Sequence, residues 1–102
     1  MNKTDTENNL NISIIMPVFN EKMDNLKKSV NSIINQNYSD WECIIICEST
    51  CRKNLEFLNE LYLKDNRFRI LIPKDKLGLA GSLNLGIQST KSKFIARFDS
   101  DD

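Results

Sequence analysis

The chain has 102 residues, of which 40% are hydrophobic and 27% charged, and its 14 basic and 14 acidic residues give a formal net charge of zero. This is the size and composition of one small globular domain or of part of one. Without an excess of basic residues, nucleic acid is not expected as a partner. The absence of histidine excludes catalytic pairs of serine or cysteine with histidine.

Apolar runs and helical stripes alternate along the chain. The expected elements, in chain order, are a strand at 12–16 closed by Pro17, a helix around 26–34, a strand at 41–47, a helix around 55–62, a strand at 68–72 stopped by Pro73, a helix around 79–87 and a strand at 94–98. Asp24 or Asn25 is expected to cap the first helix, which ends at Gln36–Asn37.

Four strands alternating with three helices predict an α/β fold with a mostly parallel sheet and helices on both faces. The simplest doubly wound strand order is 3-2-1-4, a Rossmann-like half-fold. In such sheets ligands bind at the carboxyl ends of the strands, where the chain reverses direction across the sheet. The loops expected at this edge are residues 17–21, 48–52 and 99–102.

Residues 1–11 are polar, and we expect a disordered leader before a domain at 12–102. The first apolar run, from Ile12 to Phe19, is too short to span a bilayer. No targeting signal is visible. We therefore expect a cytoplasmic protein, with at most peripheral association with the inner face of a membrane.

Three cysteines, Cys43, Cys47 and Cys51, are spaced by four residues. An odd number argues against a disulfide framework and favours a reducing compartment. If 41–47 is a strand, Cys43 and Cys47 lie about 13 Å apart, too far to share an iron–sulfur cluster. We interpret the three as thiols of the core and its loops.

Acidic residues end the chain: Asp99, Asp101 and Asp102 follow the apolar run 94–98. Three acidic residues in such a place are commonly a solvated tail. At the carboxyl end of a buried strand, however, they suit a divalent cation that also holds a substrate's phosphates.

Other nucleotide-binding patterns are missing. No G-x-G-x-x-G follows the first strand, and no P-loop sequence occurs anywhere in the chain. A response-regulator receiver is excluded because Ile72-Pro73 stands where its acceptor aspartate is needed. The glycines at Gly78 and Gly81 open the third helix, either as an anion cradle or as a tight turn into the helix.

Four segments together resemble family 2 glycosyltransferases, which have the GT-A fold. These are Ile14-Ile15-Met16-Pro17-Val18-Phe19-Asn20-Glu21, then residues 32–42, then Gly78-Leu79-Ala80-Gly81-Ser82-Leu83-Asn84-Leu85-Gly86-Ile87, and finally residues 95–102, which contain the family's Asp-x-Asp motif. The resemblance covers about residues 12–102. Each segment is a weak signal alone, but four in order at family-like spacing are specific.

The resemblance implies a transferase, inverting in type, that moves a sugar from a UDP- or GDP-linked donor to a carbohydrate acceptor in polysaccharide biosynthesis. The implied nucleotide-sugar-binding residues are Pro17, Val18, Phe19, Asn20, Glu21, Glu48, Gly78, Arg97 and Asp99. Asp99 and Asp101 are the implied ligands of Mn²⁺ or Mg²⁺. Lys74, Lys76 or Arg97 would assist with the diphosphate, although solvated surface is the commoner role for the two lysines.

The chain departs from the family at Cys47-Glu48-Ser49-Thr50, where Asp-Asp-Gly-Ser is usual. This change puts base preference in question. The family's catalytic base and acceptor-binding half follow the metal motif. The resemblance therefore implies that residues 12–102 are the nucleotide-sugar-binding half of a GT-A domain, truncated after the Asp-x-Asp motif. We expect no catalytic residue up to Asp102 and no sugar transfer by these residues alone.

Two alternatives stay open: a non-catalytic α/β binding or assembly module on the same half-fold, and, less favoured, a nucleotidyltransferase. In the order 3-2-1-4 the apolar strand 94–98 lies at a sheet edge. We therefore expect the chain to self-associate as a homo-oligomer.

Overall fold

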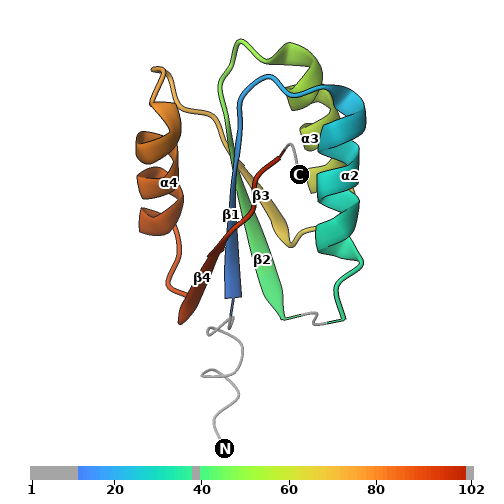
Figure 1. The fold of residues 1–102 in the computed structure, drawn as a ribbon, viewed down its shortest axis with the longest axis vertical. Coiled ribbons are helices and arrows are strands. Elements are labelled where there is room, and N and C mark those ends of the chain that lie inside the picture. Colours follow the sequence, from blue (N-terminus) through green and yellow to red (C-terminus); the bar gives the residue numbers. More distant parts are fainter. Residues whose placement is uncertain (1–11, 38–39, 101–102) are drawn as a thin grey trace, which may run out of the picture.

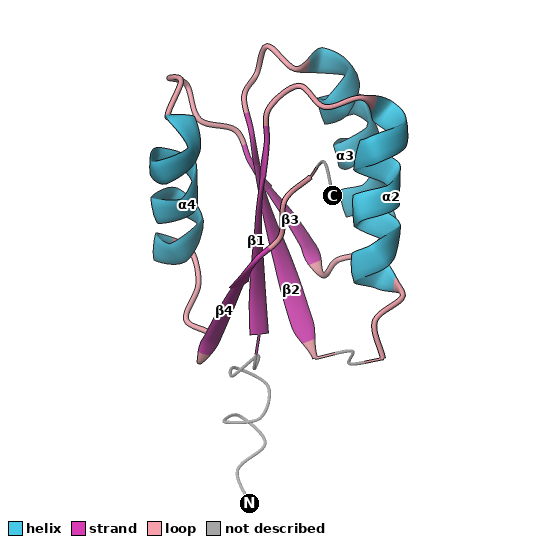
Figure 2. Ribbon diagram, viewed as in Figure 1, coloured by secondary structure: helices cyan, strands magenta, loops and turns pink. Residues whose placement is uncertain are grey.

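The computed structural model describes residues 12–37 and 40–100. The expected leader at 1–11 and the expected metal ligand Asp101 lie outside the described residues. Strands and helices alternate as the sequence predicts (Figures 1 and 2). They are β1 (Ile12–Val18), α2 (Met23–Ile34), β2 (Trp41–Cys47), α3 (Arg52–Lys64), β3 (Phe68–Leu71), α4 (Gly78–Gln88) and β4 (Phe94–Arg97).

The four strands form one parallel sheet in the order β3-β2-β1-β4. Ile12 at the start of β1 lies between Trp41 of β2 and Phe94 of β4. The predicted fold class and strand order are therefore confirmed. All strands run the same way, so their carboxyl ends meet at one edge of the sheet.

Helices cover both faces of this sheet, with α2 and α3 on one side and α4 on the other (Figure 1). The larger core lies under α2 and α3 and contains Met16, Leu26, Cys43, Leu58 and Phe68, all fully buried. A smaller cluster lies under α4 and is centred on Ile15, Ile44 and Ile46. The unequal layers follow from two helices packing on one face and one on the other.

β1 is longer than predicted, because Pro17 lies inside it rather than closing it. Proline has no N–H to donate to a neighbouring strand. The carbonyl of Ile15 accepts the N–H of Phe98 on the β4 side, and alternate residues of a strand face the same neighbour. Pro17 therefore faces the β4 side, beyond Ile15–Arg97, the last pair of the β1–β4 ladder.

The predicted cap of the first helix was wrong. α2 begins one turn earlier than its apolar stripe, its N-cap is Lys22, and no side chain caps it. Asp24 lies within the first turn instead, where a carboxylate is favoured by the helix dipole. The predicted end at Gln36–Asn37 is also late, because Asn35 is the C-cap. β3 and β4 each stop one residue before their predicted ends.

Close packing of α4 on the sheet depends on small residues. Ser82 and Gly86 are the buried residues of this helix, whereas Leu79 and Ile87 of the predicted apolar stripe are 43% and 44% exposed. A Cβ atom at Gly86 would lie 2.6 Å from Cγ2 of Ile15. The glycine thus sets how near the helix axis lies to β1.

A buried polar cluster fixes the loop that leads from α4 into β4. Ser13 on β1 is fully buried and forms hydrogen bonds with Glu42 (2.7 Å), Ser92 (2.6 Å) and Thr90, and Thr90 donates in turn to Glu42 (2.7 Å). These contacts hold the start of β4 against β1 and β2. By fixing the start of β4, these hydrogen bonds also help to place the residues that follow the carboxyl end of β4.

The three cysteines are buried and free, as predicted for thiols of the core and its loops. Over the described ranges, no helix combines the length and the apolar character that crossing a bilayer requires.

Candidate functional site

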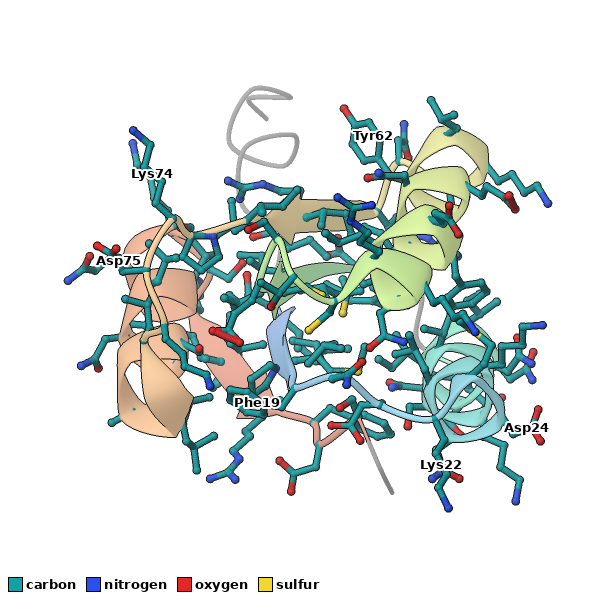
Figure 3. The ribbon with its side chains drawn as sticks, turned by 90° about the horizontal axis from the view of Figure 1, so that it is seen from above. Phe19, Lys22, Asp24, Tyr62, Lys74 and Asp75 are labelled. Atoms are coloured by element: carbon teal, nitrogen blue, oxygen red, sulfur yellow. The ribbon has the colours of Figure 1, made fainter. Side chains whose placement is uncertain are left out.

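Loops from four parts of the chain meet at the carboxyl ends of the strands. They follow β1, β2 and β4, and the fourth leads into α4. Seen from above this edge, Phe19 lies near the centre of the molecule, while Lys22, Asp24, Lys74 and Asp75 lie at its periphery (Figure 3). The structure thus puts Lys74 on the outer surface.

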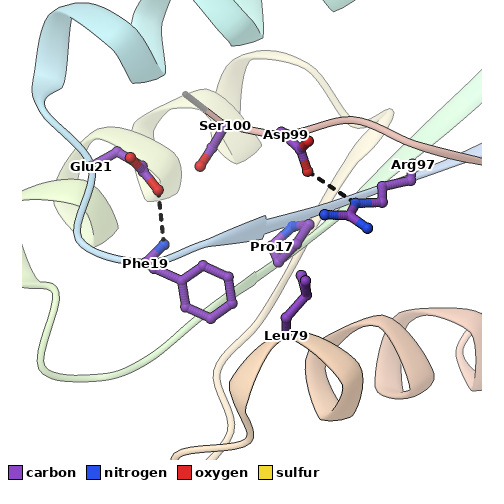
Figure 4. Close-up of a pocket in the computed structure, with 7 residues that line it drawn as sticks. All are labelled: Pro17, Phe19, Glu21, Leu79, Arg97, Asp99 and Ser100. Atoms are coloured by element: carbon purple, nitrogen blue, oxygen red, sulfur yellow. Dashed lines mark hydrogen bonds and ion pairs between the residues drawn. The ribbon is translucent and has the colours of Figure 1, made fainter. Parts of the chain in front are cut away.

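A hollow of about 230 Å³ lies between the ends of β1 and β4 and the start of α4 (Figure 4). We call it the Asp99 hollow. Five of the residues predicted from the sequence line it, namely Pro17, Phe19, Glu21, Arg97 and Asp99. Leu79 and Ser100 complete the described lining. Segments some 80 residues apart in sequence therefore form one site.

Charge in the Asp99 hollow is arranged around one ion pair. Nε of Arg97 donates to Oδ1 of Asp99 at 3.0 Å, and the two side chains are 49% and 42% exposed (Figure 4). On the opposite wall, Oε2 of Glu21 accepts the N–H of Phe19 at 3.4 Å. The described lining of the hollow thus offers two carboxylates and one guanidinium to a bound molecule.

A second hollow of about 340 Å³ lies between the ends of β1 and β2, and we call it the Glu48 hollow. It is lined by Phe19, Asn20, Glu48, Thr50, Cys51 and Lys76. Phe19 lines both hollows, and 41% of its surface is exposed. An aromatic ring with an exposed surface between two polar hollows is suited to stack on a planar group.

The loop after β1 is held in place by α3. Asn54, which is 2% exposed, accepts the N–H of Glu21 at 2.8 Å and donates to its carbonyl at 3.0 Å. Asn20 has a φ of 56°, in the left-handed region that asparagine tolerates better than most residues. The sharp turn and the double hydrogen bond together fix the loop that carries Phe19 and Glu21.

Two of the predicted site residues that the structure describes, Val18 and Gly78, are not among those lining either hollow. The side chain of Val18 is 1% exposed and packs in the larger core, so only its backbone is left to contact a ligand. Gly78 has a φ of 71°, and a Cβ there would meet nothing, so its backbone conformation explains the glycine. Asp101 lies outside the described residues.

Sequence reasoning missed two polar residues that support the site from helices, Asn54 and Ser29. Ser29 of α2 is fully buried and donates from Oγ to the carbonyl of Ser100 at 2.8 Å. The sequence does indicate that both residues are buried. Ser29 lies on the apolar stripe of Leu26 and Ile33, and Asn54 lies four residues before Leu58, on the same helix face. A polar residue on an apolar stripe is buried and needs a partner.

Asp99, the described carboxylate of the acidic motif, suits a cation that is shared with a substrate's phosphates. Over residues 12–37 and 40–100, no three His, Cys, Asp or Glu side chains are grouped to hold a metal. Mg²⁺ is typically bound by one or two carboxylates together with substrate phosphates. Asp99 supplies one carboxylate at the hollow, and the motif has a second at Asp101.

Comparison with known proteins decides the family. The family model for glycosyl transferase family 2 matches residues 13–102. The chain belongs to glycosyl transferase family 2. The resemblance seen in the sequence is thereby confirmed across nearly the whole of the described structure.

Relatives of this family 2 chain are longer than the chain itself. A Haemophilus influenzae protein described as an uncharacterized glycosyltransferase is 34% identical over 91 residues, which are 89% of this chain and 36% of that protein. The Escherichia coli UDP-Glc:alpha-D-GlcNAc-diphosphoundecaprenol beta-1,3-glucosyltransferase WfgD is 33% identical over 91 residues, 89% of this chain and 35% of that protein. The chain thus spans about a third of these two relatives.

Among solved structures, the chain is similar to the mannosyltransferase PcManGT from Pyrobaculum calidifontis in complex with GDP-Man and Mn²⁺. The TM-score is 0.80 at 14% identity, covering 91% of this chain and 28% of that one. This likeness confirms the GT-A fold predicted from the sequence.

Proposed function

We propose that this chain binds the nucleoside diphosphate part of a sugar donor across the Asp99 and Glu48 hollows. The observation that carries the proposal is that Phe19 joins the two hollows, one with Asp99 and Arg97 and the other with Glu48 and Lys76. A nucleoside diphosphate has matching parts, a flat base with N–H donors and a charged diphosphate.

Each wall of the site has a definite task in this proposal. The carboxylate of Glu48 accepts an N–H from the edge of the base, and Phe19 packs on its face. Arg97 and Lys76 donate to phosphate oxygens from either side. Glu48 stands where the family usually has aspartate, and its extra methylene moves the accepting oxygens further into the hollow.

The donor-linked cation is proposed to be Mn²⁺ or Mg²⁺, held by Asp99 and Asp101. Such a cation neutralises charge that grows on the diphosphate as the sugar leaves. The Mn²⁺ and GDP-Man of the PcManGT structure support this assignment. So does the placement of Asp99 at the carboxyl end of β4, the edge at which ligands bind in sheets of this kind.

The wider reaction is proposed from the same family. We propose an inverting transfer of the sugar from a UDP- or GDP-linked donor to a carbohydrate acceptor during polysaccharide synthesis. The name of WfgD specifies a UDP-linked donor and an acceptor on a lipid diphosphate, which supports a nucleotide-sugar donor here. The proposed place of action is the cytoplasm, at the inner face of a membrane.

Nuclear magnetic resonance mapping tests the placement of the donor. With UDP and Mg²⁺, amide shifts are expected at residues 17–21, 48–51 and 97–100. Glu48→Gln is expected to weaken UDP and GDP binding about tenfold, because a hydrogen bond to a charged acceptor is lost. Glu56→Gln, an exposed change on α3, is the matched control.

Two results would contradict the proposal. One is a shift map centred elsewhere, such as the groove between α2 and α3 that contains Lys27 and Phe57. The other is equal nucleotide affinity in the Glu48→Gln and Glu56→Gln variants.

A further inference from the structure

Ser29 connects a helix of the larger core to the acidic motif. It is fully buried on α2, between Leu26 and Val30 of the stripe that faces the core. Its Oγ donates to the backbone carbonyl of Ser100 at 2.8 Å, across 71 residues of sequence. Replacing this residue with an apolar one would leave the carbonyl of Ser100 without this donor.

The bond acts where regular pairing of β4 has ended. The β1–β4 ladder pairs residues up to Ile15 and Arg97, and the N–H of Phe98 then donates to the carbonyl of Ile15 at 3.0 Å. Ser29 holds the backbone two residues further on. Within the described residues, the segment 98–100 is therefore held to β1 through Phe98 and to α2 through Ser100.

Neighbouring side chains of this segment differ sharply in exposure. Ser100 is 2% exposed, whereas the side chain of Asp99 is 42% exposed and lines the hollow. A backbone held inward at Ser100 leaves Asp99 turned outward. Within the part of the chain that the structure describes, the other contact of the Asp99 side chain is its ion pair with Arg97, which is itself half exposed and so constrains it weakly.

We propose that Ser29 is a positioning residue for the acidic motif. Its hydrogen bond fixes the backbone at Ser100, so that Asp99 faces the hollow and the motif is ordered before cation and diphosphate arrive. Ser29 touches neither of them. The inference rests on the proposed function, because it assigns Ser29 to the part of donor binding that depends on the cation.

The decisive variants remove the donor and keep the fold. Ser29→Ala deletes the hydroxyl, and Ser29→Cys fills the same space with a much weaker donor. Ser32→Ala, an exposed change on the same helix, is the matched control. UDP affinity is measured with and without Mn²⁺, at a temperature where circular dichroism shows all four proteins folded.

The wild type is expected to bind UDP more tightly with Mn²⁺ than without it. Both Ser29 variants should reduce that gain about two- to tenfold, the effect of one buried hydrogen bond. Their affinity without Mn²⁺ should stay at the wild-type value. Ser32→Ala should match the wild type in both conditions.

Hydrogen exchange gives a second readout that needs no ligand. In the Ser29 variants, amides of residues 98–100 should exchange faster, while those of β1 and β2 keep their wild-type rates. A variant that is only less stable would show faster exchange throughout, or a lower melting temperature with an unchanged Mn²⁺ gain. Either result would overturn the inference.

Failure of this inference can be told from failure of the proposed function. If the wild type binds UDP with a clear Mn²⁺ gain and the Ser29 variants keep that gain, only the role of Ser29 is wrong. If the wild type itself binds neither UDP nor GDP, the proposed function is wrong, and the positioning role falls with it.

Discussion

Among the described residues that line the Asp99 hollow, Arg97 is the one cation, and its pairing with Asp99 is exposed to solvent. Exposed ion pairs contribute about 0–1 kcal/mol to stability. Arg97→Gln should therefore change the free energy of unfolding by less than about 1 kcal/mol. It should nevertheless weaken UDP binding about tenfold, because a charged hydrogen bond to phosphate is lost.

Calorimetry of UDP and uridine separates these effects. Uridine affinity should not change in Arg97→Gln, since the nucleoside has no phosphate. Lys91→Gln, an exposed change before β4, is the control. Unchanged UDP affinity in Arg97→Gln would contradict a role for Arg97 at the diphosphate.

Buried thiols predict a loss of stability in alkali. Burial, together with nearby Cys51 and Glu48, raises the pKa of Cys47 from 9.0 to about 12, and burial raises the pKa of Cys43 still further. Above about pH 9 these thiols ionise in the unfolded chain but stay protonated in the folded one. The unfolded state then binds fewer protons, so the free energy of unfolding falls as pH rises.

Urea unfolding between pH 8 and 11, under reducing conditions, measures this slope. Cys43→Ala should lower stability at every pH but show a shallower decline above pH 9 than the wild type. Parallel declines in the two proteins would show that lysines and tyrosines, not this thiol, cause the alkaline loss.

At the residue scale, the sequence predicted the ligand-facing side of the site better than its support. Asp99 and Glu48 could be placed because parallel strands bring their carboxyl ends to one edge. Val18 stays a predicted contact through its backbone, because alternation along β1 turns its side chain into the core. Ser29 and Asn54 could have been recognised as buried polar residues from their place on apolar stripes, but local spacing does not identify their partners, because Ser100 and Glu21 are far away in sequence.

At the scale of elements, Gly86 limits how closely α4 can pack. A Cβ there would lie 2.6 Å from Cγ2 of Ile15 and 3.1 Å from Cδ1 of Ile46, and both isoleucines are buried. Gly86→Ala should lower the free energy of unfolding by about 1–3 kcal/mol. In this prediction, the cost of the steric overlap exceeds the gain of about 1 kcal/mol that alanine brings through its higher helix propensity.

Asn84→Ala, an exposed change on the same helix, is the control, and it should alter stability by less than about 0.5 kcal/mol. Urea denaturation compares the two. A Gly86→Ala protein as stable as the wild type would mean that α4 can move away from β1 at little cost.

Elements were predicted well, and their limits less well. Apolar runs such as 41–47 gave the strands, because both faces of this sheet are covered. The N-terminus of α2 was misplaced because Lys22 caps it without a side-chain bond. Pro17 was predicted to end β1, but it lies inside the strand. A proline fits there because the β1–β4 ladder has already ended at Ile15–Arg97, and the local sequence around Pro17 does not show where β4 ends.

At the scale of the whole molecule, β4 is an apolar edge of the described sheet. Phe94 and Ile95 are 65% and 45% exposed, and β4 is paired on one side only within the described residues. Unpaired edges of this kind join other chains. We predict that the chain self-associates through β4, as a two-fold dimer in the simplest case.

Light scattering over a concentration series measures this association. Ile95→Lys should shift the equilibrium to monomer, while Ile87→Lys, a similarly exposed change on α4, should leave it unchanged. Monomers at high concentration, with freely exchanging β4 amides, would contradict the prediction.

We propose above that this molecule binds a nucleoside diphosphate together with a divalent cation at the Asp99 hollow. Calorimetric titration of UDP and GDP, each with and without Mn²⁺, measures this binding. At least one nucleotide should bind more tightly with Mn²⁺, and Mn²⁺ should bind more tightly with that nucleotide by the same factor, because the coupling is reciprocal. Asp99→Asn and Asp101→Asn should each remove most of this coupling. Equal affinity for both nucleotides in the presence and absence of Mn²⁺ would contradict the account.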